Sequence, residues 1–265
     1  MPLRLMLVSL LAVGVSFSAH AAILVDDQFI DGGITNGGDT LDAAWSAITP
    51  PTPGSVSLIS PFGGSNATNA LHLGTTTTFS GALGTFTNGT ALALGDSITL
   101  AFDLRLTSAP TANGAGLRFG FGSANNTYGF TYGEGGTVGA AFVQWSPALL
   151  SGNPNVIYAA SSTPSSSIND QVSHSFSITL TRASSNTLSL SASVDGVAYT
   201  AITGGTVSSF TFNNILIGNG NVIQAFNLDN VVVSTAAAIP EPSTWAALAG
   251  GMGLVVAIYR RRRVF

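Results

Sequence analysis

The chain has 265 residues and no cysteine, and 8% of its residues are charged, whereas about 25% is usual in globular domains. The lack of cysteine excludes disulfides and thiolate metal sites, so stability has to come from a hydrophobic core. Between residues 22 and 239, ten Asp and one Glu stand against three Arg. The resulting net charge of −8 argues against a nucleic-acid partner.

The first 21 residues have the pattern of a secretory signal peptide. Arg4 supplies a positive charge, residues 5–17 are apolar, and Ala19-His20-Ala21 is an Ala-x-Ala cleavage site. An apolar run of thirteen residues is too short to span a membrane. We therefore expect export through the Sec machinery and removal of residues 1–21.

Residues 22–235 predict one all-β domain, an antiparallel β-sandwich or jelly roll. Apolar and polar residues alternate with a period of two at 98–107 and again at 175–180, as in half-buried strands. Frequent Gly and Asn separate the runs, and no long apolar pattern has the helical period. Further strands are expected at residues 24–29, 56–59, 70–73, 83–86, 117–121, 128–132, 138–145, 156–160, 188–194, 197–202, 210–217 and 225–233.

Asp195-Gly196 lies between two alternating runs and predicts a two-residue hairpin. A type I′ turn needs positive φ at both central residues, which Asp-Gly tolerates. We therefore expect residues 188–194 to pair with residues 197–202.

The residue types give little support to catalysis. Glu134 is the only Glu of the domain and lies in a Gly-rich turn, whereas a glycosidase needs two facing carboxyl groups. His72 and His174 fall in expected strands, where histidine is an ordinary strand residue more often than a base or a zinc ligand. We expect a protein that is not an enzyme, with a glycosidase as a distant alternative.

A structural calcium ion is the one cofactor that the sequence suggests. Asp26 and Asp27 lie in the first expected strand, and Asp229 and Asn230 lie in the last. Pairing of the terminal strands, common in jelly rolls, would bring these oxygen ligands together, and Ca²⁺ prefers such ligands. The alternative is that these side chains are solvated or cap turns.

Three aromatic residues are candidates for carbohydrate binding. Tyr128, Tyr132 and Trp145 lie in one region of the chain with polar neighbours, and exposed rings of this kind stack on sugars. The alternative is that they belong to the core.

The segment 236–265 combines a linker with three further features in a fixed order. Pro240, Glu241 and Pro242 hold the backbone extended, because proline excludes a helix there. Residues 245–259 are apolar and uncharged, near the lower length limit of a membrane helix. A basic block follows directly and consists of Arg260, Arg261, Arg262 and Arg263. Because positive flanks stay cytoplasmic, we expect a short C-terminal transmembrane helix with this block as the membrane stop.

The motif Pro-Glu-Pro-Ser-Thr-Trp-Ala, the short apolar run and the terminal Arg cluster together resemble the PEP-CTERM sorting signal over residues 239–263. The resemblance implies that exosortase, a membrane enzyme of bacteria that make extracellular polysaccharide, reads this tail and cuts near the motif. The protein would first be anchored in the membrane through the C-terminal helix. Processing would then release it to the cell surface or the extracellular space.

The domain more loosely resembles the concanavalin A-like jelly rolls that often precede such tails. The residues behind this likeness are 25–29, 41–45 and 226–231. Lectins, laminin G-like modules and glycosidases share that architecture, so it does not choose among functions. We expect a non-catalytic structural or interaction protein of the cell surface or of the extracellular polysaccharide. The alternative is a lectin-like carbohydrate-binding module.

Overall fold

The structure is a computed structural model. It describes residues 21–35, 40–47, 56–59, 69–74, 79–107, 116–123, 126–133, 140–145, 155–159, 171–198, 202–204, 209–220, 225–238, 250–253 and 259. The chain divides into one compact unit of residues Ala21–Ala238 and a second unit that contains Met1–His20 and Ile239–Phe265. In the second unit the described residues are helical at 250–253 and at Tyr259. Within the described part of the chain, no helix has the length and hydropathy needed to cross a membrane.

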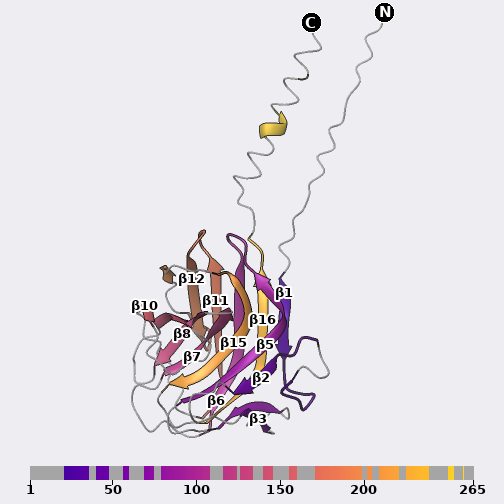
Figure 1. Cartoon of the computed structure of the whole chain (residues 1–265), viewed down its shortest axis with the longest axis vertical. Helices are drawn as coiled ribbons and strands as arrows, with labels where there is room; N and C mark the ends of the chain where they lie inside the picture. Colours follow the sequence, from indigo (N-terminus) through magenta and orange to yellow (C-terminus); the bar gives the residue numbers. More distant parts are fainter. Residues whose placement is uncertain are drawn as a thin grey trace, which may run out of the picture. The chain divides into compact units, whose positions relative to one another are not determined.

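The unit of residues 21–238 is an antiparallel β-sandwich of two sheets, as the alternating pattern predicts (Figure 1). Sheet A follows the order β13-β12-β11-β6-β16-β4-β3, with β1 also paired to β16 and β14 to β12. Its strands are β1 (Ala22–Asp27), β3 (Val56–Ile59), β4 (Ala70–Leu73), β6 (Ser97–Leu106), β11 (His174–Arg182), β12 (Leu188–Val194), β13 (Val197–Ala198), β14 (Ile202–Gly204) and β16 (Phe226–Ala236).

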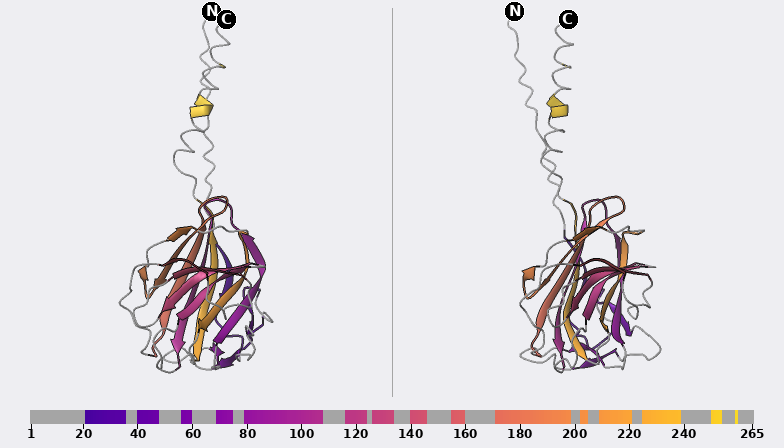
Figure 2. Two further views of the ribbon diagram at one scale, coloured as in Figure 1. Left: turned by 60° about the vertical axis from the view of Figure 1, so that its left-hand side comes forward. Right: turned by 90° about the vertical axis from the view of Figure 1, so that its left-hand side faces the viewer.

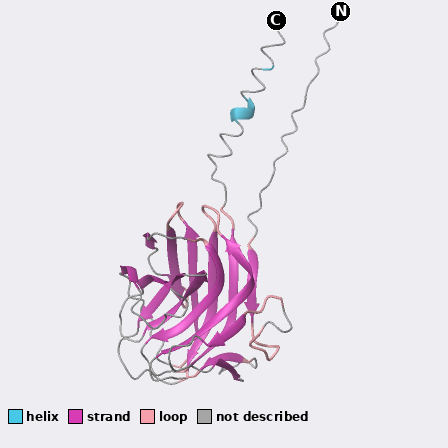
Figure 3. Ribbon diagram, in the orientation of Figure 1, coloured by secondary structure: helices cyan, strands magenta, loops and turns pink. Residues whose placement is uncertain are grey.

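Sheet B follows the order β10-β9-β8-β7-β15-β5-β2 and faces sheet A, as the right-hand view of Figure 2 shows. Its strands are β2 (Ala44–Ala47), β5 (Phe79–Ala91), β7 (Gly116–Ser123), β8 (Asn126–Gly133), β9 (Ala140–Trp145), β10 (Asn155–Ala159) and β15 (Thr211–Gly220). Strands dominate this unit, with loops and turns at their ends (Figure 3).

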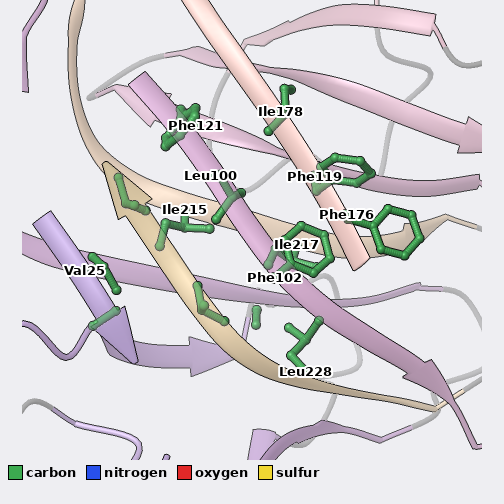
Figure 4. Packing of buried hydrophobic residues seen from close by; sticks show 14 of the residues in the cluster. Val25, Leu100, Phe102, Phe119, Phe121, Phe176, Ile178, Ile215, Ile217 and Leu228 are labelled. Atoms are coloured by element: carbon green, nitrogen blue, oxygen red, sulfur yellow. The ribbon is translucent and has the colours of Figure 1, made fainter. Parts of the chain in front are cut away.

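The core lies between the sheets and is built from the inward residues of the alternating strands. Phe102 of β6 and Phe176 of β11 are stacked with ring centroids 5.3 Å apart. Phe119 of β7 meets both rings edge-on, at 5.2 Å from Phe102 and 5.4 Å from Phe176 (Figure 4). Burial of each such side chain contributes about 1.5–3 kcal/mol, so this cluster joins the two sheets.

The last strand of the domain lies inside sheet A. Strand β16 pairs with β6 on one side, and with β1 and β4 on the other. The first and last strands of the domain therefore pair, as the sequence led us to expect, with Ala22 opposite Thr235. The expected linker from residue 236 is shorter in the structure, because Ala236 still pairs with Ser97 and the Ala238 N–H bonds to Asp96.

The hairpin predicted at Asp195-Gly196 is confirmed. Val194 pairs with Val197, and φ is 50° at Asp195 and 77° at Gly196. The strand expected at 197–202 corresponds to β13 and to the start of β14 at Ile202, and residues 199–201 lie outside the described ones. Both short strands pair with β12.

Substitution of Gly196 isolates the cost of the positive φ in this turn. A Cβ at Gly196 would meet no atom within 4 Å, so backbone strain alone determines the effect. We expect Gly196→Ala to lower the free energy of unfolding by about 1 kcal/mol and Gly196→Val to lower it further. Urea unfolding measures both, and exposed Ala198→Val should stay within about 0.5 kcal/mol of the wild type. An equal loss of unfolding free energy in the variants at positions 196 and 198 would show that the positive φ of Gly196 is not the cause.

Candidate functional site

The carboxylate of Asp27, at the end of β1, ties three segments together. One oxygen accepts the Phe29 N–H at 3.1 Å. The other accepts the indole N–H of Trp45 at 2.7 Å and the Ala43 N–H at 3.3 Å. Asp27 is 2% exposed and Trp45 3% exposed. Because β1 belongs to sheet A and Trp45 lies in β2 of sheet B, this carboxylate links the two sheets.

Burial raises the pKa of Asp27 to about 6, since a charged carboxylate is poorly solvated in this position. The hydrogen bonds from Trp45, Phe29 and Ala43 favour the charged form and oppose that rise. The negative charge of Asp42 adds to it. Asp27 therefore holds its proton more tightly in the folded protein than in the unfolded chain.

The four residues expected to bind calcium have other positions and partners in the structure. The oxygens of Asp27 already accept three N–H groups. Although β1 and β16 pair, their register sets Asp26 opposite Val232, while Asp229 lies opposite Asp103 of β6. Among the residues that the structure describes, no group of three or more His, Cys, Asp or Glu could hold a metal ion.

A polar cluster that the sequence did not reveal lies on sheet A, where β16 bulges between residues 229 and 232. Asp103 accepts hydrogen bonds from the Asn230 side chain at 2.8 Å and from the Ser175 hydroxyl at 2.7 Å. Asn230 has a φ of 51°, and its backbone N–H donates to Asp229 at 2.8 Å. Asp103 therefore stabilises the bulge. The sequence signal was Asp229-Asn230 interrupting an apolar strand.

The two histidines of the domain are held by strand neighbours. The His72 Nδ1 lies 2.8 Å from the side-chain oxygen of Asn227, its register partner on β16. The His174 Nδ1 lies 2.7 Å from a carboxylate oxygen of Asp195. The other oxygen of Asp195 accepts the Ser175 N–H at 3.0 Å. Both imidazoles thus connect neighbouring elements of sheet A.

The three candidate sugar-binding aromatics lie in β8 and β9 of sheet B. The register sets Tyr128 opposite Phe121 and Asn126 opposite Trp145. The side chains of these three residues lie outside the described ones, so carbohydrate binding by them stays a prediction.

The remaining candidates also lie outside the described residues. These are Glu134, the sorting motif Pro240, Glu241 and Pro242, and the block Arg260, Arg261, Arg262 and Arg263.

No protein-family model and no curated protein matches the chain. Among solved structures, it is similar to the carbohydrate recognition domain of Emp47p, with 12% identity over 82% of this chain and 95% of that chain, at a TM-score of 0.47. It is also similar to a Bacillus subtilis protein of unknown function with a galectin-like fold, with 12% identity over 84% and 99%, at 0.49. A third is the alginate lyase Aly36B, with 10% identity over 64% and 81%, at 0.42. Similarities this low leave the function to be argued from the residues of this chain.

The raised pKa of Asp27 predicts how stability depends on pH. The folded pKa of about 6 exceeds the ordinary value of 3.8. The contribution of Asp27 is therefore fully present below the ordinary value and is lost as pH rises through the folded value. Its size is about 2–3 kcal/mol at roughly 1.4 kcal/mol for each pKa unit. Thermal unfolding between pH 4 and pH 8 measures it.

The variant Asp27→Asn separates this contribution from that of other groups. Because the amide of Asn does not titrate, we expect the thermal stability of this variant to depend less on pH. We also expect lower stability, because the amide N–H₂ would face N–H donors. The control is Asp31→Asn, because Asp31 is exposed and accepts one N–H, from Gly33. If Asp27→Asn keeps the wild-type pH slope, Asp27 is not the titrating group.

Proposed function

We propose that this chain is an exported cell-surface protein of the PEP-CTERM type, sorted by exosortase, with a non-catalytic sandwich that serves a structural or interaction role. The observation that carries the proposal is the order of signals in the sequence. A signal peptide at residues 1–21 precedes the domain. Pro240-Glu241-Pro242, an apolar run and Arg260 to Arg263 follow it.

The chemistry of the tail explains how sorting would proceed. The signal peptide would start export through the Sec machinery, and the apolar run from Trp245 would halt it. The arginines resist transfer, because each charge at the bilayer centre costs about 2.5–3.5 kcal/mol on insertion scales. The Pro-Glu-Pro segment would then lie at the outer face of the membrane, within reach of exosortase.

The sandwich supports this role in two ways. Ala22 pairs with Thr235, so removal of both signals leaves the terminal strands β1 and β16 joined. The acids Asp27, Asp103 and Asp195 bind backbone and side-chain donors that hold strands together, which supports a structural use of these groups. The order of strands in the two sheets supports a jelly roll of the concanavalin A-like kind as the architecture of the domain.

Mutation of Glu241 tests the sorting role. In a host that has exosortase, we expect the wild type to lose its tail and Glu241→Ala to remain full length in the membrane. Ser243→Ala, two residues further on, serves as the matched control and should be processed. Immunoblots of membrane and extracellular fractions give the ratio of the two forms. Persistence of full-length wild type in the membrane would favour a permanent anchor.

A second candidate function, binding of an uncharged polysaccharide, is favoured by one face of sheet A. The outward positions of β11 and β12 hold only Ser and Thr and are partly or well exposed. Their hydroxyls are connected across strands, with Ser177 and Ser193 2.9 Å apart and Thr179 2.8 Å from Thr99 of β6. Hydroxyls both donate and accept hydrogen bonds, so these outward positions of β11 and β12 match the hydroxyls of a neutral sugar polymer.

A bulky charged side chain among the outward Ser and Thr residues of β11 and β12 tests polysaccharide binding. We expect the purified protein to sediment with an insoluble neutral glucan and Thr179→Arg to lose most of that retention. Thr211→Arg, at an exposed position of β15 in sheet B, should retain binding. Absence of wild-type binding, or equal loss in both variants, would remove this candidate.

A further inference from the structure

The turn between β5 and β6 is held in place by its own residues and by β11. The Asp96 N–H donates to the Ala93 carbonyl at 3.1 Å, and one carboxylate oxygen of Asp96 accepts the Ala93 N–H at 3.0 Å. The Gly95 N–H donates to the Arg182 carbonyl, and the Arg182 N–H donates to the Asp96 carbonyl, both at 2.9 Å. The turn is therefore fixed relative to the end of β11.

The side chain of Arg182 strengthens this arrangement. Its guanidinium donates to the Leu92 carbonyl at 2.8 Å and lies 4.0 Å from the centre of the Phe210 ring. The turn thus offers a rigid surface beside the end of β16.

Two contacts hold the end of the domain against this turn. The second carboxylate oxygen of Asp96 accepts the Ala238 N–H at 2.9 Å. A Cβ at Gly95 would stand 2.7 Å from the Ala238 Cβ, so the chain passes over Gly95 in direct contact. Gly95 also has a φ of 86°, which favours glycine. Both residues of the turn are therefore suited to hold Ala238.

We infer that Gly95 and Asp96 form a clip that holds the chain at Ala238 and restricts access of a processing enzyme to the Pro-Glu-Pro segment. The clip itself stands on the contacts above, and its effect on processing rests on the proposed sorting function. Pro240 follows Ala238 after one residue, Ile239. Asp96 and Gly95 are positioning residues, since they act on the motif through Ala238.

The short distance along the chain explains the restriction. An enzyme that reads a peptide binds it in extended form over several residues, through the backbone as well as the side chains. On the N-terminal side of Pro240 these residues include Ala238, whose N–H is occupied by Asp96. Cleavage of a locally opened segment follows the population of the open form when opening and closing are fast. Loss of the clip should therefore speed processing.

Hydrogen exchange in the full-length protein in detergent micelles tests the clip without any processing enzyme. We expect Asp96→Ala to reduce the protection of the Ala238 amide about tenfold, the order expected for loss of a charge-assisted hydrogen bond. Asp31→Ala is the control, because Asp31 accepts one backbone N–H in an exposed turn, whereas Asp96 accepts two. Equal exchange at Ala238 in the wild type and in Asp96→Ala would overturn the clip.

A glycine pair tests the contact with Gly95. Gly95→Ala and Gly196→Ala both place a side chain at positive φ, 86° and 77° respectively. Only the first new Cβ meets Ala238, because nothing lies within 4 Å at position 196. We expect faster exchange at Ala238 in Gly95→Ala alone. The same increase in both variants would assign the effect to general destabilisation.

The rate of tail removal in an exosortase host then tests the consequence. We expect Asp96→Ala and Gly95→Ala to lose the tail several times faster than the wild type, and both controls to match the wild type. If the variants lose the tail at the wild-type rate although hydrogen exchange at Ala238 is faster, the effect on enzyme access is overturned and the clip stands. If the wild type keeps its tail while the Ala238 amide still exchanges faster in the two variants, the sorting function is refuted and the clip is not.

Discussion

Packing between the two inner sheet faces is the interaction on which the rest of the structure depends. The chain has no cysteine, which excludes disulfides, and only 8% of its residues are charged. Phe102, Phe119 and Phe176 join the sheets through apolar contact. Asp27 adds a polar link at the edge of this core through Trp45, which is why its burial has consequences for stability. A buried carboxylate with satisfied bonds fixes one arrangement of strands, because other registers would leave it unpaired.

Three carboxylates of the described sandwich make hydrogen bonds that stabilise turns and a bulge. Asp103 stabilises the bulge of β16, Asp195 stabilises the β12–β13 turn, and Asp96 stabilises the β5–β6 turn. Asp96 accepts a backbone N–H of its own turn, Asp103 accepts the Asn230 side chain of the bulge, and Asp195, itself in a turn, is hydrogen-bonded to Ser175 and His174 of β11. These three acids thus lie where the regular ladder is interrupted, and such places leave backbone groups without ladder partners.

The sequence predicted the fold class well, because period-two alternation reports one buried face directly. The strands around Leu100 and Ile178 and the turn at Asp195-Gly196 came from local patterns that tertiary contacts did not override. The polar sites could not be predicted in the same way. Asp103, Ser175 and Asn230 lie on three different strands, and the register shift near Asn230 brings them together. Register between distant strands depends on the whole sheet, so the sequence could not show that Asp229 lies opposite Asp103.

The position of β16 also determines when the domain can fold. It is the last of the described strands in chain order, and it occupies an inner place in sheet A between β6 and the pair β1 and β4. A nascent chain that lacks residues 226–236 cannot join β1 to the rest of the sheet, so these partners stay apart until the whole domain has emerged. Such non-local pairing closes slowly. Under the export proposed above, a chain with this strand order would complete its sandwich only after residues 226–236 had crossed the membrane, and that folding would hinder backward movement.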